Sequence, residues 1–158
     1  MAILISNKID FKTKLIKRDK EGHYILLKGT IHQQDITIIN IYAPNNGAAT
    51  FIKQTLLKFK NQIDHNTIIM GDFNTPLSPL DRSSKQKLNK ETRELNITIN
   101  NLDLTDIYRI YQPSSNGYTF FSAEEAPLGS VAQIFYMGYA DVIGYIILLL
   151  EHNHTIIQ

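Results

Sequence analysis

The order of hydrophobic patterns in the first half of the chain most strongly limits what it can fold into. Two segments rich in Ile, Leu, Thr and Tyr, His23–Ile31 and Asp35–Tyr42, are separated by a few polar residues, which predicts an antiparallel hairpin. From Thr50 the apolar residues recur at helical spacing, and Thr67–Met70 is then a continuous apolar run, typical of a strand covered on both faces. Strands that alternate with helices indicate an α/β layered sandwich.

Three further elements are expected outside this segment. Ala2–Ser6 has the composition of a short strand, and Tyr118–Phe121 is predicted to be another. A second helix is predicted from Lys85 to Asn101, with its apolar residues on one side. At 158 residues the chain has the size of one domain.

Charge and composition narrow the possible partners and compartments. The net charge is +1, so a nucleic-acid partner would need a local basic patch rather than overall charge. Two groups of basic residues could supply one: Lys12, Lys14, Lys17, Arg18 and Lys20, and Arg82, Lys85, Lys87, Lys90 and Arg93. The absence of cysteine excludes disulfides and zinc–thiolate sites. No basic segment precedes the short apolar run at the N-terminus, so we expect no signal peptide and an intracellular, nuclear or cytoplasmic location.

The C-terminal part differs in character from the rest. Val131–Leu150 is about long enough to span a bilayer as a helix, although Gln133 and Asp141 interrupt it. The alternatives are a buried helix or strand pair, or an apolar tail that does not pack. The sequence alone leaves these three possibilities open.

The segment Gly71–Pro76, GDFNTP, carries the residues best suited to chemistry. Asp72 and Asn74 lie two residues apart, and in an extended backbone such residues project from the same face. A carboxylate can orient or deprotonate an attacking water, and a carboxamide can donate to a phosphate oxygen in the transition state. The alternative is that both side chains only satisfy the backbone of a turn.

Other polar residues could join this pair. Tyr42 ends its own predicted strand, Asn45 follows in the next loop, and Arg82 and Thr119 could contact a nucleic-acid backbone. Each of these also has an ordinary structural explanation, in packing, in a turn or as a solvated side chain.

Four segments together resemble a known family. They are Asn40–Asn45 (NIYAPN), Ile69–Ser83 (IMGDFNTPLSPLDRS), Leu104–Arg109 (LTDIYR) and Tyr118–Ala123 (YTFFSA). They are similar to the endonuclease domain of LINE-type (non-LTR) retrotransposon polyproteins, within the exonuclease III-like endonuclease/exonuclease/phosphatase superfamily. The resemblance implies that 1–123 is part of a four-layer α/β sandwich and that 124–158 is an unrelated apolar tail.

The resemblance also implies an activity and a set of site residues. The family nicks DNA with a divalent metal, usually Mg²⁺. Asp72 matches the aspartate that orients the nucleophilic water, Asn74 its companion on the phosphate, and Tyr42 the active-site tyrosine. By the same resemblance, Asn45, Arg82 and Thr119 match positions near the DNA-binding surface.

The family pattern is incomplete in this sequence. The family has a metal-binding glutamate upstream, and downstream it has an aspartate and a Ser-Asp-His-Ser motif, which do not occur here. His152 and His154 lie in EHNHTIIQ, which does not resemble that motif, and we interpret them as tail residues. We therefore expect a truncated fragment that is inactive alone. The alternatives are a fragment that retains weak DNA affinity, or a membrane-associated peptide anchored by 131–150.

Overall fold

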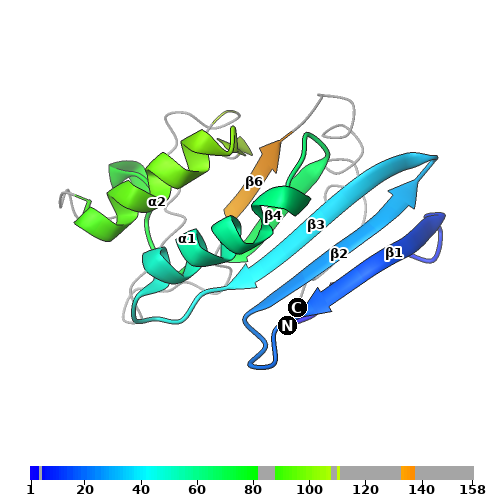
Figure 1. Cartoon of the computed structure of the whole chain (residues 1–158), viewed down its shortest axis with the longest axis horizontal. Coiled ribbons are helices and arrows are strands. Elements are labelled where there is room, and N and C mark those ends of the chain that lie inside the picture. Colours follow the sequence, from blue (N-terminus) through cyan, green and yellow to red (C-terminus); the bar gives the residue numbers. More distant parts are fainter. Residues whose placement is uncertain (4, 82–87, 108–109, 111–132, 138–158) are drawn as a thin grey trace.

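The computed structural model describes residues 1–3, 5–81, 88–107, 110 and 133–137, with the backbone alone described for the last segment. A mixed sheet of six strands forms its centre, with strand order β1-β2-β3-β4-β6-β5 (Figure 1). The strands are β1 (Phe11–Arg18), β2 (Tyr24–Ile31), β3 (Gln34–Tyr42), β4 (Thr67–Asp72), β5 (Thr105–Asp106) and β6 (Gln133–Met137). The helices are α1 (Ala48–Phe59) and α2 (Lys90–Asn101), with short 3-10 turns η1 (Lys60–Gln62) and η2 (Pro79–Asp81).

The predicted hairpin is confirmed as β2 and β3, which pair antiparallel. The connection has His32 and Gln33 at its tip, both with positive φ (49° and 67°). Two consecutive residues of positive φ give a turn whose twist matches that of the strands it joins. The turn therefore fixes a register in which Tyr24 lies opposite Ile41.

The helix predicted from Thr50 is confirmed as α1, and the apolar run from Thr67 is confirmed as β4. The chain passes from β3 through α1 to β4, which pairs parallel to β3. This is a β–α–β unit, and its parallel pairing brings the carboxyl ends of both strands to one edge of the sheet.

Both helices cover the same face of the sheet (Figure 1). The main core lies between them and the strands, and its largest members include Leu26, Ile39, Ile41 and Ile69 of the sheet, Ile52, Leu56 and Phe59 of α1, and Leu95 and Ile99 of α2. A smaller apolar cluster occupies the opposite face, where Ile36 and Ile68 are buried among Phe11, Ile31, Ile38, Met70 and Ile107. Both faces of β3 and β4 are therefore apolar, as expected for a strand covered on both sides.

Several expectations are corrected. The described residues of Ala2–Ser6 form no strand; instead the side-chain amide of Asn40 donates to the Ala2 carbonyl (3.3 Å). Helix α2 begins at Lys90 rather than Lys85, because Asn89 has an extended backbone and its side chain accepts a hydrogen bond from the Thr92 amide (2.8 Å). Such a bond satisfies one of the free N–H groups at a helix start.

The apolar C-terminal segment enters the sheet in its described part. Gln133–Met137 forms β6, which pairs antiparallel with β4 and with β5. A single helix over Val131–Leu150 is therefore wrong for these residues, and a strand is found instead. In the part of the chain that the structure describes, no helix has the length and apolar character to cross a membrane. The predicted strand Tyr118–Phe121 lies outside the described residues, and the division at residue 123 stays a prediction.

Candidate active site

Tyr42 and Asp72 lie side by side at the carboxyl ends of β3 and β4. They are partners in the parallel register of these strands, and the Ala43 amide donates to the Asp72 carbonyl (2.9 Å). The neighbours Ile41, Ala43 and Phe73 belong to the core beneath the helices, so strand alternation directs Tyr42 and Asp72 to the opposite face. Both side chains are exposed, Tyr42 to 48%. The hydroxyl group of Tyr42 and the carboxyl group of Asp72 therefore lie on one face of the sheet, at the carboxyl ends of β3 and β4.

Gly71 makes this close approach of the two strands possible. Its φ is +137°, a backbone conformation that residues with a side chain rarely adopt. A Cβ atom at this position would overlap the carbonyl group of Ile41. Because the strands approach so closely here, Asp72 is fixed relative to the end of β3.

Asn74 also lies near Tyr42 and Asp72, but its backbone conformation differs from the one predicted. Its φ is 46°, so the chain has turned out of the strand, and the extended geometry expected for Asp72 and Asn74 is wrong. The Asn74 backbone amide donates to Asp72 Oδ1 (3.1 Å), and its side-chain Nδ2 donates to the Ala43 carbonyl (2.7 Å). An amide NH₂ group has two hydrogens, so one fixes the side chain and the second is left for another acceptor.

The remaining predicted residues are only partly described. Asn45 is exposed in the loop that follows β3, at the edge where Tyr42 and Asp72 lie. Arg82 and Thr119 lie outside the described residues, and their proximity to DNA stays a prediction. The structure thus brings Tyr42, Asp72 and Asn74 together.

Asp81, which sequence reasoning missed, holds the loop after Asn74 in place. It is 1% exposed, and its Oδ2 accepts from the backbone amides of Leu77 (3.0 Å) and Ser78 (2.7 Å). The Asn96 side chain of α2 donates to the Leu77 carbonyl (2.8 Å) and ties the loop to that helix. A serine followed three residues later by an acidic residue is the spacing of a capping box, and this signal could have identified Asp81.

Comparison with known proteins supports this architecture. No protein-family model matches the chain. Among solved structures, it is similar to the endonuclease domain of TRAS1, a telomere-specific non-LTR retrotransposon, with a TM-score of 0.57 and 14% identity over 85% of this chain and 56% of that one.

Structures of TDP2 are also similar, more weakly. D. rerio TDP2 complexed with a single-strand DNA product has a TM-score of 0.46 and 8% identity over 83% of this chain and 55% of that one. TDP2 from C. elegans has a TM-score of 0.46 and 11% identity over 82% of this chain and 42% of that one. The similarity to the TRAS1 domain shows that the chain shares its α/β fold. The chain spans about half the length of the structures that it matches.

Proposed function

We propose that this chain carries part of a phosphodiester-hydrolysing site that acts on DNA, as the endonuclease domains of non-LTR retrotransposons do. The observation that carries the proposal is the pairing of Tyr42 with Asp72 at adjacent strand ends, with the Asn74 side chain bonded to the carbonyl of Ala43, which directly follows β3. In α/β proteins, ligands bind at the carboxyl ends of strands, where polar groups from different segments converge.

Each of the three side chains has a chemical role that suits phosphodiester hydrolysis. One oxygen of Asp72 accepts from the Asn74 amide, which leaves the other to orient an attacking water. The second hydrogen of the Asn74 amide group and the hydroxyl of Tyr42 would donate to non-bridging phosphate oxygens. Because the Asn74 side chain is held by the Ala43 carbonyl, this donor needs little reorganisation as charge develops on the phosphate.

The resemblance implies Mg²⁺, and the described residues do not fit a site that would hold this ion by protein ligands alone. Mg²⁺ is bound through one or two carboxylates, waters and substrate phosphates. Among the described residues, no group of three carboxylate or imidazole ligands close enough to share an ion includes Asp72. We therefore assign no catalytic step to the metal.

We further propose that this chain alone is inactive as a nuclease. General acid–base catalysis contributes about 10²–10⁴ in rate, and a metal ion contributes several kcal/mol of charge stabilisation. The sequence lacks the family's Ser-Asp-His-Ser motif, so the histidine that completes the site is not supplied by a matching segment. Losing both contributions leaves hydrolysis close to the uncatalysed rate.

Two measurements test the two parts of this proposal separately. Titration of the labelled chain with a short DNA duplex, followed by NMR, is expected to shift the backbone amides of Tyr42, Ala43 and Asn45 and those of 72–75. Asp103→Asn, at an exposed turn position where φ is 52°, is the matched control for Asp72→Asn because it removes a carboxylate elsewhere. Shifts confined to other segments would exclude a phosphate site at this edge.

A nicking assay on supercoiled plasmid with Mg²⁺ tests the second part. The chain and its Asp72→Asn variant are both expected to leave the plasmid supercoiled. If the parent chain nicks the plasmid, and this activity is lost in Asp72→Asn but kept in Asp103→Asn, the proposed inactivity is refuted and the proposed site is supported. Nicking that all three chains share would contradict the assignment of this edge.

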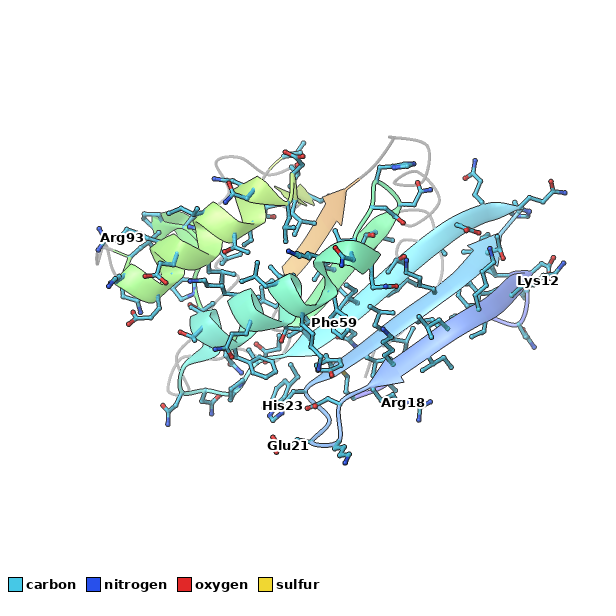
Figure 2. All side chains as sticks on the ribbon, viewed as in Figure 1. Lys12, Arg18, Glu21, His23, Phe59 and Arg93 are labelled. Atoms are coloured by element: carbon cyan, nitrogen blue, oxygen red, sulfur yellow. The ribbon has the colours of Figure 1, made fainter. Side chains whose placement is uncertain are left out.

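A second candidate function, DNA binding without hydrolysis, is favoured by the composition of β1. Exposed basic residues extend along this outermost strand from Lys12 to Arg18 (Figure 2), although Lys12 lies 3.6 Å from Asp10 and Lys14 is paired with Asp35. Binding through this strand would be strongly salt-dependent. Neutralising Lys17 and Arg18 to Gln is expected to reduce the slope of log affinity against log salt by about one for each lost phosphate contact, whereas Lys60→Gln should leave it unchanged. No retention of DNA at low salt would exclude this function.

A further inference from the structure

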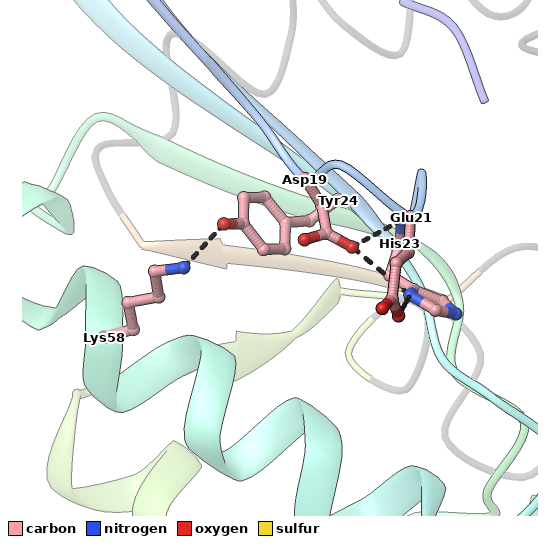
Figure 3. Close-up of polar contacts among 5 residues, drawn as sticks. All are labelled: Asp19, Glu21, His23, Tyr24 and Lys58. Carbon is pink, nitrogen blue, oxygen red and sulfur yellow. Dashed lines mark hydrogen bonds and ion pairs between the residues drawn. The ribbon is translucent and has the colours of Figure 1, made fainter.

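The turn between β1 and β2 brings together three side chains that the candidate active site does not use. Asp19, Glu21 and His23 each direct one potential metal-ligand atom to a common point, and these atoms all lie within 4.8 Å of one another (Figure 3). His23 Nδ1 is 3.2 Å from Asp19 Oδ2 and 3.5 Å from Glu21 Oε2. The group therefore combines one imidazole nitrogen with two carboxylates.

Two of the three ligands are already held in place by their surroundings. The His23 backbone amide donates to Asp19 Oδ2 (3.2 Å), and the His23 ring packs against Phe51 of α1 with its centroid 5.2 Å away. The side chains of Asp19 and His23 are each 24% exposed. Glu21 is 80% exposed, so its carboxylate can rotate toward the other two at little cost.

The spacing of these atoms fits one bound cation. Zinc binds imidazole nitrogen and carboxylate oxygen at about 2.0–2.2 Å in tetrahedral geometry, which separates neighbouring ligand atoms by about 3.4 Å. The two distances from His23 Nδ1, 3.2 Å and 3.5 Å, lie on either side of this value. The third distance, between the Asp19 and Glu21 oxygens, lies within 4.8 Å, and rotation of the exposed Glu21 side chain could adjust it.

Lys58, on helix α1, contacts Tyr24 rather than this group. Lys58 Nζ donates to the Tyr24 hydroxyl (2.6 Å) and lies 4.8 Å from the centroid of that ring (Figure 3). It therefore does not occupy the position between the carboxylates of Asp19 and Glu21. With the imidazole neutral, the three ligands together carry two negative charges, which a divalent cation would balance.

We propose that Asp19, Glu21 and His23 bind a divalent transition-metal cation of the zinc type through Oδ2, Oε2 and Nδ1. An imidazole ligand favours zinc, copper or nickel over Mg²⁺, which prefers oxygen ligands. Three protein ligands leave a fourth tetrahedral position for water or another ligand. This site is independent of the proposed nuclease activity.

The cation would stabilise the turn at the edge of the sheet where Tyr42 lies. The Tyr42 backbone amide donates to the His23 carbonyl (2.8 Å), so the metal ligand and the end of β3 are joined by one hydrogen bond. Binding would cross-link the end of β1 to the start of β2. Because Tyr42 is bonded to His23, this cross-link would also fix the position of Tyr42.

Calorimetric titration of the full chain with Zn²⁺, and with Mg²⁺ for comparison, tests this site. One Zn²⁺ is expected to bind more tightly than Mg²⁺. Because even the hydrogen-bond partners of metal ligands change affinity by about 10–100-fold, His23→Gln and Asp19→Asn are expected to weaken Zn²⁺ binding at least about tenfold. His65→Gln, at an exposed turn, and the double variant His152→Gln/His154→Gln are the matched controls and should bind as the parent does.

A second measurement needs no variant and locates the ion directly. Paramagnetic Co²⁺ added to the ¹⁵N-labelled chain is expected to shift or broaden the amides of 19–24 first. No saturable Zn²⁺ binding would mean that the three side chains form only an ion pair, and would overturn the proposal. Binding that survives His23→Gln but is lost in the double variant, or Co²⁺ effects that begin at another segment, would overturn it equally.

Discussion

Gly71→Ala should separate β4 from β3 at the point where Tyr42 and Asp72 meet. Gly71 has a φ of +137°, and a Cβ atom there would overlap the Ile41 carbonyl oxygen and lie 2.8 Å from both the carbonyl carbon and the amide nitrogen of Ile41. All three atoms belong to the backbone of a buried strand, so no side chain can move aside to make room. The strand itself must shift.

The expected loss of stability follows from two contributions. Holding a residue with a side chain in such a conformation costs about 1–3 kcal/mol. Separation of the strand ends also breaks the bond from the Ala43 amide to the Asp72 carbonyl (2.9 Å), at about 1 kcal/mol. Together these give about 2–4 kcal/mol, and at about 2–4 °C per kcal/mol for a chain of this size the Tm should fall by roughly 10 °C.

Thermal unfolding followed by circular dichroism would measure this change, with Gly47→Ala as the matched control. Gly47 also has a positive φ, 74°, but a Cβ atom there would meet nothing within 4 Å. Its substitution therefore adds only the cost of the left-handed conformation, about 1–2 kcal/mol. Equal falls in Tm for the two variants would refute the argument that contact with Ile41, rather than φ alone, makes Gly71 necessary.

Two further predictions concern the loop after the site and the surface between the helices. Asp81→Ala should lower the free energy of unfolding by about 1–3 kcal/mol for each amide left without its acceptor, those of Leu77 and Ser78; chemical denaturation measures this, and a loss below 1 kcal/mol would contradict it. The hydrogen bond and the charge of Lys53 lower the pKa of Glu94, so this ion pair adds stability above the pKa of the unfolded state and loses it as the pH falls through the folded pKa. Lys53→Met should raise the pKa of Glu94 toward its ordinary value in an NMR titration, and an unchanged pKa would exclude Lys53 as the cause.

The central part of the fold could be predicted because its patterns are local. The hairpin of β2 and β3, helix α1 and strand β4 each carry their own periodicity or turn signal within a short segment. The burial of β4 on both faces also followed from its continuous apolar sequence. In each case the side chains that decide the structure are neighbours in the chain.

Strand β1 was missed because its composition is that of a solvated surface. Four of its eight residues are Lys or Arg, which led us to interpret it as a basic patch. Charged residues on an outermost strand prevent pairing with other chains, so a polar sequence is compatible with an edge strand. Conversely, Ala2–Ser6 has a strand-like composition but forms no strand in its described residues. Antiparallel pairing with β2 makes Phe11–Arg18 a strand, and the composition of a segment carries no record of its pairing.

The arrangement of the candidate site residues could not be predicted from local sequence patterns either. The spacing of Asp72 and Asn74 suggested a shared face in an extended strand, whereas a left-handed turn at Asn74 brings the two together. Tyr42 reaches Asp72 only because β4 returns parallel to β3, and His23 lies beside Tyr42 only because β2 runs antiparallel to it. The directions of the strands thus bring two groups that are remote in sequence to the same end of the sheet. Tyr42 and Asp72 are suited to a phosphate, and the group that contains His23 is suited to a cation. A change that shifts β3 along β2, rather than one that removes a single ligand, should therefore disturb both groups at once.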